Sequence, residues 1–173
     1  MGRTTLIKFS VTPGQTPLNP DELDDLIPDY ISLQSELDEL EQANILEAES
    51  NLFGRDHSEI LNEEFLKNIH KRMFDKVWKW AGQFRRSDKN IGCEWTEIPI
   101  LLKILLDDAR YWIANKTFDP DETVMRFHFR LVHKIHGFPN GNGRHARLMA
   151  DLLITKVGRS RFSWGSQSLK RPG

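Results

Sequence analysis

Apolar residues recur at steps of three and four along most of the chain, which is the spacing of amphipathic helices. Glycine and proline fall mainly between these periodic stretches, where helices end. The pattern predicts an all-α fold with about six helices. They are expected over residues 21–27, 31–52, 58–80, 98–115, 121–135 and 143–157.

Two stretches lack the helical period. Residues 1–20 hold several prolines and glycines, which predicts an extended arm that could carry one short strand. Residues 83–98 contain the turn signal Asn90–Gly92. We therefore expect residues 84–87 and 93–96 to pair across this turn in a short β-hairpin flap.

Length and composition indicate one soluble domain. The chain has 173 residues, of which 39% are hydrophobic and 28% charged, with a net charge of −1. We divide it into an N-terminal arm and helix, residues 1–54, and a core, residues 55–173, packed as one compact unit. The balanced charge predicts no nucleic-acid partner. The lone Cys93 excludes an internal disulfide.

No apolar run reaches the length of a membrane span, so no membrane partner is predicted. The N-terminus lacks the apolar core of a secretory signal. We therefore expect a cytoplasmic protein.

The segment His136–Arg147, HGFPNGNGRHAR, differs from the rest of the chain. It lies between two helical patterns, so it is a loop that leads into a helix N-terminus. Gly141 and Gly143 allow the backbone to bend and to approach a ligand closely, and Asn142 between them adds a neutral donor. The free N–H groups of the first helical turn then favour an anion, best of all a phosphate.

Three side chains of this segment extend the interpretation. Arg144 and Arg147 are three residues apart and share a helix face, and two guanidinium groups suit a polyphosphate. His136 lies just before the loop and can accept a proton from an attacking hydroxyl. These residues indicate phosphoryl or nucleotidyl transfer. The alternative is a glycine-rich turn between helices with two surface arginines.

The same run closely resembles the Fic motif, His-x-Phe-x-(Asp/Glu)-Gly-Asn-Gly-Arg-x-x-Arg. The resemblance extends from about Phe65 to Val157, and the whole chain is similar to a compact bacterial subgroup sometimes labelled mobile mystery protein B. It implies the Fic fold, a bundle of about six or more helices with a β-hairpin flap.

The resemblance implies a protein adenylyltransferase, which moves AMP from ATP to a Ser, Thr or Tyr hydroxyl with Mg²⁺. ATP is then the substrate, self-modification is expected and a homodimer is possible. The implied roles are His136 as general base, Phe138 as the loop's anchor, Gly141, Asn142 and Gly143 as the phosphate nest, Arg144 on the β- and γ-phosphates and Arg147 as a brace.

One position departs from the motif. The family's acidic residue, which binds Mg²⁺, is Asn140 here. An amide oxygen is an uncharged ligand, so we expect weaker metal binding. The departure leaves other functions open: a nucleotide-binding regulator with weak or altered catalysis, transfer of another nucleotide, or removal of AMP. A toxin-like role in a mobile element also stays open.

Many family members carry an inhibitory helix whose glutamate pairs with the motif's second arginine, Arg147 here. The acidic helix over residues 31–52 does not match the inhibitory pattern literally. Glu41 is the first candidate and Glu39 the second. The alternative is a solvated acidic face on an amphipathic helix.

The flap of this family aligns a target segment by adding a β-strand beside the active site. Ile91 and Trp95 are candidates for clamping that target, and simple packing is the alternative. His145, inside the arginine pair, is expected at the surface.

Overall fold

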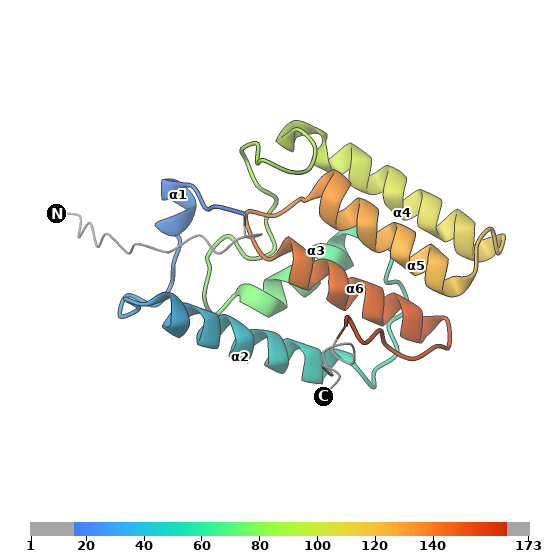
Figure 1. The fold of residues 1–173 in the computed structure, drawn as a ribbon, viewed down its shortest axis with the longest axis horizontal. Helices are drawn as coiled ribbons and strands as arrows, with labels where there is room; N and C mark the ends of the chain where they lie inside the picture. Colours follow the sequence, from blue (N-terminus) through green and yellow to red (C-terminus); the bar gives the residue numbers. More distant parts are fainter. Residues whose placement is uncertain (1–15, 166–173) are drawn as a thin grey trace, which may run out of the picture.

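The computed structural model describes residues 16–165, and within them the fold is mainly helical (Figure 1). The prediction of an all-α fold is confirmed. The elements are α1 (Pro20–Leu23), α2 (Gln34–Leu52), α3 (Glu63–Phe74), the 3₁₀ turn η1 (Trp95–Glu97), α4 (Ile98–Ala114), α5 (Pro120–Phe129), the π-helical turn η2 (Arg130–Ile135) and α6 (Asn142–Lys156).

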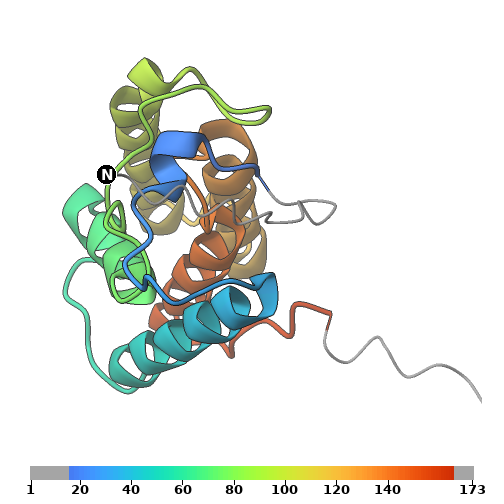
Figure 2. The ribbon, with the colours of Figure 1, turned by 90° about the vertical axis from the view of Figure 1, so that its left-hand side faces the viewer.

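Helix α6 lies at the centre of the bundle. It packs against α3 and α5, while α4 packs on α5 and α2 packs on α3. Ala146, Met149, Ala150 and Ile154 of α6 are fully buried, which leaves this helix little surface for solvent. α1 and α2 lie on either side of the N-terminal end of α6 (Figures 1 and 2). Two N-terminal segments therefore lie near the N-terminal end of α6, which is formed by residues of the segment His136–Arg147.

Helix α3 is shorter than the predicted run over residues 58–80. It begins at Glu63 because the side chain of Asn62 accepts the N–H of Phe65 at 3.1 Å and so caps the helix. Past Phe74, the backbone bonds to the N-terminal segment instead: the N–H of Ile27 donates to the carbonyl of Val77 at 2.8 Å. Apolar residues keep the helical spacing beyond Phe74 because the turn that follows the helix is also buried.

The predicted β-hairpin flap is wrong. The described residues, 16–165, contain no β-strand, and their isolated β-bridge joins Leu26 to Trp78. Buried Arg85 explains the difference, because its guanidinium donates to the carbonyls of Ser87 at 2.8 Å and Cys93 at 2.5 Å. One side chain thus takes acceptors that a hairpin ladder would need, and residues 85–94 form a loop.

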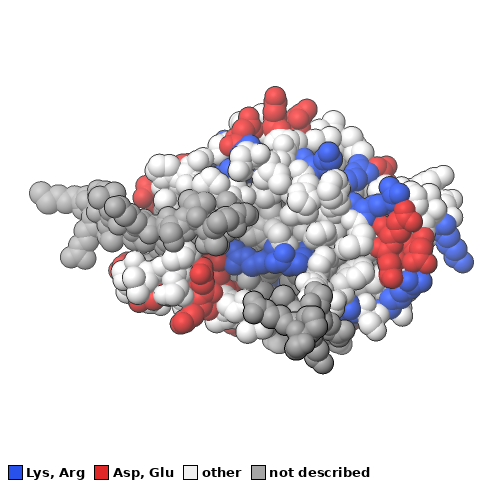
Figure 3. All heavy atoms as spheres, in the orientation of Figure 1, with Lys and Arg blue, Asp and Glu red and all other residues white. Residues whose placement is uncertain are grey.

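Some predictions fall on residues that are not described. Most of the arm, residues 1–15, and the end of the tail, residues 166–173, lie outside the described part. The division into residues 1–54 and 55–173 stays a prediction. Among residues 16–165, no helix has the length and apolar character that a bilayer crossing requires. Basic and acidic side chains are interspersed over the face in Figure 3.

Candidate functional site

The motif loop, residues 136–141, begins and ends at residues with a left-handed backbone conformation. The π-helical turn η2 delivers His136, which has a left-handed backbone (φ 50°) and whose N–H donates to the carbonyl of Leu131 at 3.0 Å. At the other end, Gly141 caps α6 with φ 76°. A Cβ at Gly141 would collide with the ring of Phe74. Glycine is therefore required there, both for the backbone conformation and for the close approach.

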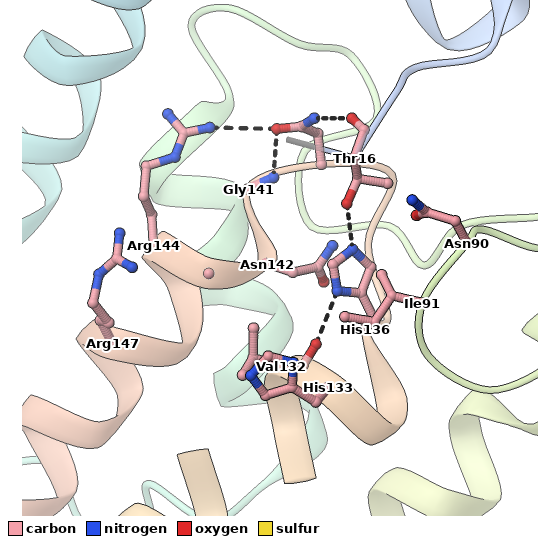
Figure 4. Close-up of a pocket in the computed structure, with 12 residues that line it drawn as sticks. Thr16, Asn90, Ile91, Val132, His133, His136, Gly141, Asn142, Arg144 and Arg147 are labelled. Carbon is pink, nitrogen blue, oxygen red and sulfur yellow. Dashed lines mark hydrogen bonds between the residues drawn. The ribbon is translucent and has the colours of Figure 1, made fainter. Parts of the chain in front are cut away.

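The ring of His136 is oriented by its own backbone. Its Nδ1 lies 2.9 Å from the carbonyl oxygen of Val132. A carbonyl only accepts, so Nδ1 carries the proton and Nε2 presents a lone pair. Nε2 lies 2.9 Å from the Thr16 hydroxyl (Figure 4). Burial lowers the pKa of His136 below its usual value, with a smaller contribution from Arg85. The ring is therefore a neutral acceptor at pH 7.

Phe138 anchors the loop in the core, as expected. Its ring is buried and stacks on the ring of His70 at a centroid distance of 3.7 Å. His70 accepts the N–H of Gly82 on Nδ1 at 2.9 Å, so its Nε2 donates to the carbonyl of Asn140 at 3.0 Å. Burial holds the pKa of His70 well below its usual value. A neutral histidine thus ties the motif loop to α3.

The side chain of Asn142 braces the loop from inside. Its Oδ1 accepts the N–H of Phe138 at 2.9 Å and its Nδ2 donates to the carbonyl of the same residue at 2.8 Å. The side-chain amide is therefore committed to the loop, and Asn142 can serve an anion through its backbone N–H. His145 is buried rather than exposed: its Nε2 donates to the carbonyl of Leu66 at 2.9 Å, and burial lowers the pKa of its ring to about 4.

One cavity of about 660 Å³ collects most of the predicted site. Figure 4 shows Arg144 and Arg147 on one side, and Asn90 and Ile91 beside His136. Trp95 is 42% exposed and lies outside this lining. The lining consists of Thr16, Asn90, Ile91, Val132, His133, His136, Asn140, Gly141, Asn142, Gly143, Arg144 and Arg147.

The cavity joins a base to an anion site. The N-terminal turn of α6 opens into it, so free backbone N–H groups and the positive end of the helix dipole face the same space as His136. Arg147 is exposed and forms no ion pair with any residue from 16 to 165. The arrangement can hold a phosphate group close to a histidine that takes a proton.

Glu41 of α2 reaches this site. It is 6% exposed, its Oε2 lies 2.6 Å from Nη1 of Arg144, and its Oε1 accepts the indole N–H of Trp78 at 2.7 Å. The resemblance implied a pair with Arg147, and the structure pairs Glu41 with Arg144 instead. Glu39 lies on the exposed face of the same helix. The first of the two candidate glutamates is thus the one that meets the motif.

The side chain of Asn140 is engaged in internal hydrogen bonds. Its Oδ1 accepts the N–H of Gly141 at 2.7 Å and lies 3.4 Å from Nη2 of Arg144, while its Nδ2 donates to the carbonyl of Thr16 at 2.9 Å. An oxygen that faces an N–H and a guanidinium is a poor ligand for a cation. In the described part of the chain, no group of three or more His, Cys, Asp or Glu residues could hold a metal. This donor set does not fit Mg²⁺.

Sequence reasoning missed Thr16, His70 and Arg85. Arg85 joins the loop of residues 85–94 to the motif, because its Nε donates to the carbonyl of His136 at 2.7 Å. The spacing of apolar residues along the sequence does not indicate that an arginine in a polar stretch is buried. Thr16 lies 120 residues before His136, and no local pattern links the two.

The family model described as Fic/DOC family matches residues 60–154, which is more than half of the chain. Among curated proteins, the chain is 35% identical over 94 residues to "Protein adenylyltransferase Fic" of Aedes aegypti, covering 52% of this chain and 19% of that protein. It is 31% identical over 114 residues to "Protein adenylyltransferase fic-1" of Caenorhabditis elegans, covering 62% and 22%. The chain spans about a fifth of the length of these relatives.

Solved structures share the fold. The N-terminal Fic domain of a Bartonella quintana effector matches with a TM-score of 0.66 and 18% identity, covering 79% of this chain and 76% of that one. BepC of Bartonella tribocorum, solved with bound AMPPNP, matches with a TM-score of 0.65 and 19% identity, covering 81% and 80%. At these identities the likeness shows the fold alone.

Proposed function

The chain belongs to the Fic/DOC family, and we propose that it is a protein adenylyltransferase. It would move AMP from ATP to a Ser, Thr or Tyr hydroxyl of a protein, its own chain included. The names of the curated relatives and the AMPPNP in one structural neighbour support the nucleotide and the reaction. A cytoplasmic location and a homodimer stay predictions.

The orientation of His136 is the observation that carries this proposal. The bond from Nδ1 to Val132 leaves Nε2 free to accept a proton, on the side where the cavity and a hydroxyl already lie. A placed general base contributes about 10²–10⁴-fold to the rate. The remaining acceleration would come from holding the phosphates and neutralising their charge.

We assign the phosphates to the N-terminus of α6. The backbone N–H groups of Asn142 and Gly143 would surround the α- and β-phosphates, and the N–H of Gly141 would join them once it leaves Oδ1 of Asn140. Arg144 would hold the β- and γ-phosphates, and Arg147 would brace the same region. Ile91, half-buried beside His136, would pack against the target segment. Trp95 could touch a target only outside the cavity lining.

Glu41 is our candidate for autoinhibition. It occupies the guanidinium that we assign to phosphate, and the indole of Trp78 fixes its position. ATP must therefore displace a carboxylate before Arg144 can bind it. Because Glu39 is exposed, we assign inhibition to Glu41 alone.

The engaged Asn140 also supports a second candidate, a nucleotide-binding regulator with weak or altered catalysis. Asn140 offers Mg²⁺ no free oxygen in this arrangement. The two functions differ in their need for His136, because a binding module does not require a base.

The test is the intact mass of the purified chain after incubation with ATP, with and without Mg²⁺. We expect the chain to gain the mass of one AMP. The rate of this gain should be at least about 100-fold lower in His136→Ala, because that variant lacks the general base. The control is His57→Gln, since His57 contacts the carbonyl of Leu52 and a glutamine can do the same. ATP binding with no gain of mass, even in Glu41→Gln, would contradict the transferase and favour the regulator.

A further inference from the structure

A hydroxyl of the chain itself occupies the position of an acceptor. The Oγ1 atom of Thr16 lies 2.9 Å from Nε2 of His136 (Figure 4). Because Nδ1 carries the ring proton, Nε2 is the acceptor and the Thr16 hydroxyl donates. A general base needs this contact with the hydroxyl whose proton it removes.

The segment that carries Thr16 is held by several independent contacts. Lys89 donates to the carbonyl of Pro17 at 3.2 Å and to Oε2 of Glu22 at 2.6 Å. The Lys89 and Glu22 side chains are only 3% and 9% exposed, so this ion pair is largely shielded from solvent. Asn19 also donates to the Ser87 hydroxyl at 2.8 Å. Thr16 is thus positioned by the loop of residues 85–94.

The departure from the family motif fits this segment. Nδ2 of Asn140 donates to the carbonyl of Thr16 at 2.9 Å, while Oδ1 accepts the N–H of Gly141. An ionised aspartate only accepts, and it would place a negative oxygen against the Thr16 carbonyl. Asparagine at this position therefore suits a chain that keeps Thr16 in its own site.

Thr16 shares a cavity with the anion site. The lining of the cavity includes Thr16, His136 and the first turn of α6 from Gly141 to Arg144. The hydroxyl and the candidate phosphate site thus face the same space.

We propose that Thr16 is the acceptor of an intramolecular AMP transfer, an inference that rests on the proposed function. The Thr16 oxygen forms a bond to the α-phosphorus of ATP, and its proton passes to Nε2 of His136. The bond from the α-phosphorus to the oxygen that bridges to the β-phosphate breaks, and pyrophosphate leaves. The product is a phosphodiester between Thr16 and adenosine. An external hydroxyl reaches His136 only after Thr16 has moved away.

The experiment locates the label. The full chain and its Glu41→Gln variant are incubated with ATP and Mg²⁺, digested, and mapped by tandem mass spectrometry. We expect one AMP on the peptide that contains Thr16, formed at a rate that does not change with protein concentration. Thr16→Val should lose this label and Thr16→Ser should keep it. Thr117→Val, at an exposed threonine between α4 and α5, should label like the wild type.

The outcomes separate the inference from the proposed function. AMP on another residue, with Thr16 unmodified, would overturn the inference and leave the transferase standing. A labelling rate that rises with protein concentration would overturn the intramolecular transfer. No label in any variant, Glu41→Gln included, would overturn the function and the inference together. Thermal unfolding of Thr16→Val shows whether a lost label reflects a lost fold, and the wild-type map does not depend on that variant.

Discussion

Two N-terminal segments contact the motif at different residues, and they bring different chemistry. The segment of residues 16–22 presents a neutral hydroxyl to the base His136. Helix α2 presents a buried carboxylate, Glu41, to Arg144. The hydroxyl lies beside the proposed base, whereas the carboxylate occupies the guanidinium that we assign to phosphate.

The comparison of Thr16 with Glu41 shows that contact with a residue of the motif does not by itself decide whether a side chain acts as a substrate or as an inhibitor. A hydroxyl at hydrogen-bond distance from a neutral base is compatible with attack on phosphorus. A carboxylate on an arginine competes with the anion that the arginine would bind, because both are acceptors for the same donors. We therefore read residues 16–22 as a substrate segment and α2 as an inhibitory one.

The largest effect is expected at α2. Glu41→Gln keeps the shape of the side chain and removes the charge opposite Arg144. A hydrogen bond to a charged group contributes about 1.5–3 kcal/mol, so ATP binding should tighten by roughly ten- to a hundredfold. AMP transfer should rise in parallel. Isothermal titration with ATP and intact mass spectrometry measure the two changes.

Glu39→Gln is the matched control for this prediction. It makes the same chemical change two residues earlier, on the exposed face of α2. It should leave both ATP affinity and labelling unchanged. An equal rise in both variants would show that the charge of the helix, and not the contact with Arg144, limits the reaction.

A smaller effect is expected at the segment of residues 16–22. Lys89→Met removes the contacts to Pro17 and Glu22 but touches neither Arg144 nor α2. Loss of about 1 kcal/mol in the positioning of Thr16 would slow its labelling about fivefold, with ATP affinity unchanged. Peptide-resolved mass spectrometry follows the label. Lys103→Met, which breaks an exposed ion pair with Asp107, is the control. A parallel loss of ATP affinity would contradict the separation of the two segments.

The smallest effect is expected from pH. Burial lowers the pKa of His136 from its usual 6.5, so the ring stays neutral, and able to take a proton, below that pH. Labelling of Thr16 should be nearly constant from about pH 8 to 6.5 and fall only in more acidic solution. A loss centred above pH 6.5 would contradict a buried neutral base.

Stability must be followed over the same range of pH. The ring of His145 is buried with a pKa of about 4, whereas in the unfolded chain it titrates near 6.5. The unfolded state therefore binds more protons in this interval, and the free energy of unfolding falls as pH is lowered from 6.5 towards 4. Thermal melts at each pH identify the range in which the rate reports on His136 alone.

The sequence predicted the helices well because their burial is periodic. The apolar face of α4 begins and ends close to where the pattern places it. The prediction failed over residues 75–80 and 84–96. Trp78 and Trp80 are buried in a turn, so the spacing of apolar residues extended the predicted helix beyond its actual end. The hairpin failed because buried Arg85 bonds the carbonyls of its loop, a tertiary contact that turn residues do not reveal.

The candidate site was predictable where it is local. The motif places His136, the glycines and the arginines within twelve consecutive residues, and the fold brings them to one cavity. Thr16 and Glu41 come from distant segments, 120 and 103 residues away from their partners. The acidic helix suggested Glu41, but which arginine it meets depends on how α2 packs. Nothing local suggested Thr16.

The most direct test of the account is the time course of AMP on the Thr16 peptide, followed side by side in the wild type and Glu41→Gln. The account predicts the same single labelled residue in both chains and a rate at least about tenfold higher in the variant. Label on a different residue would contradict the role of residues 16–22. Equal rates on Thr16 would contradict the role of α2.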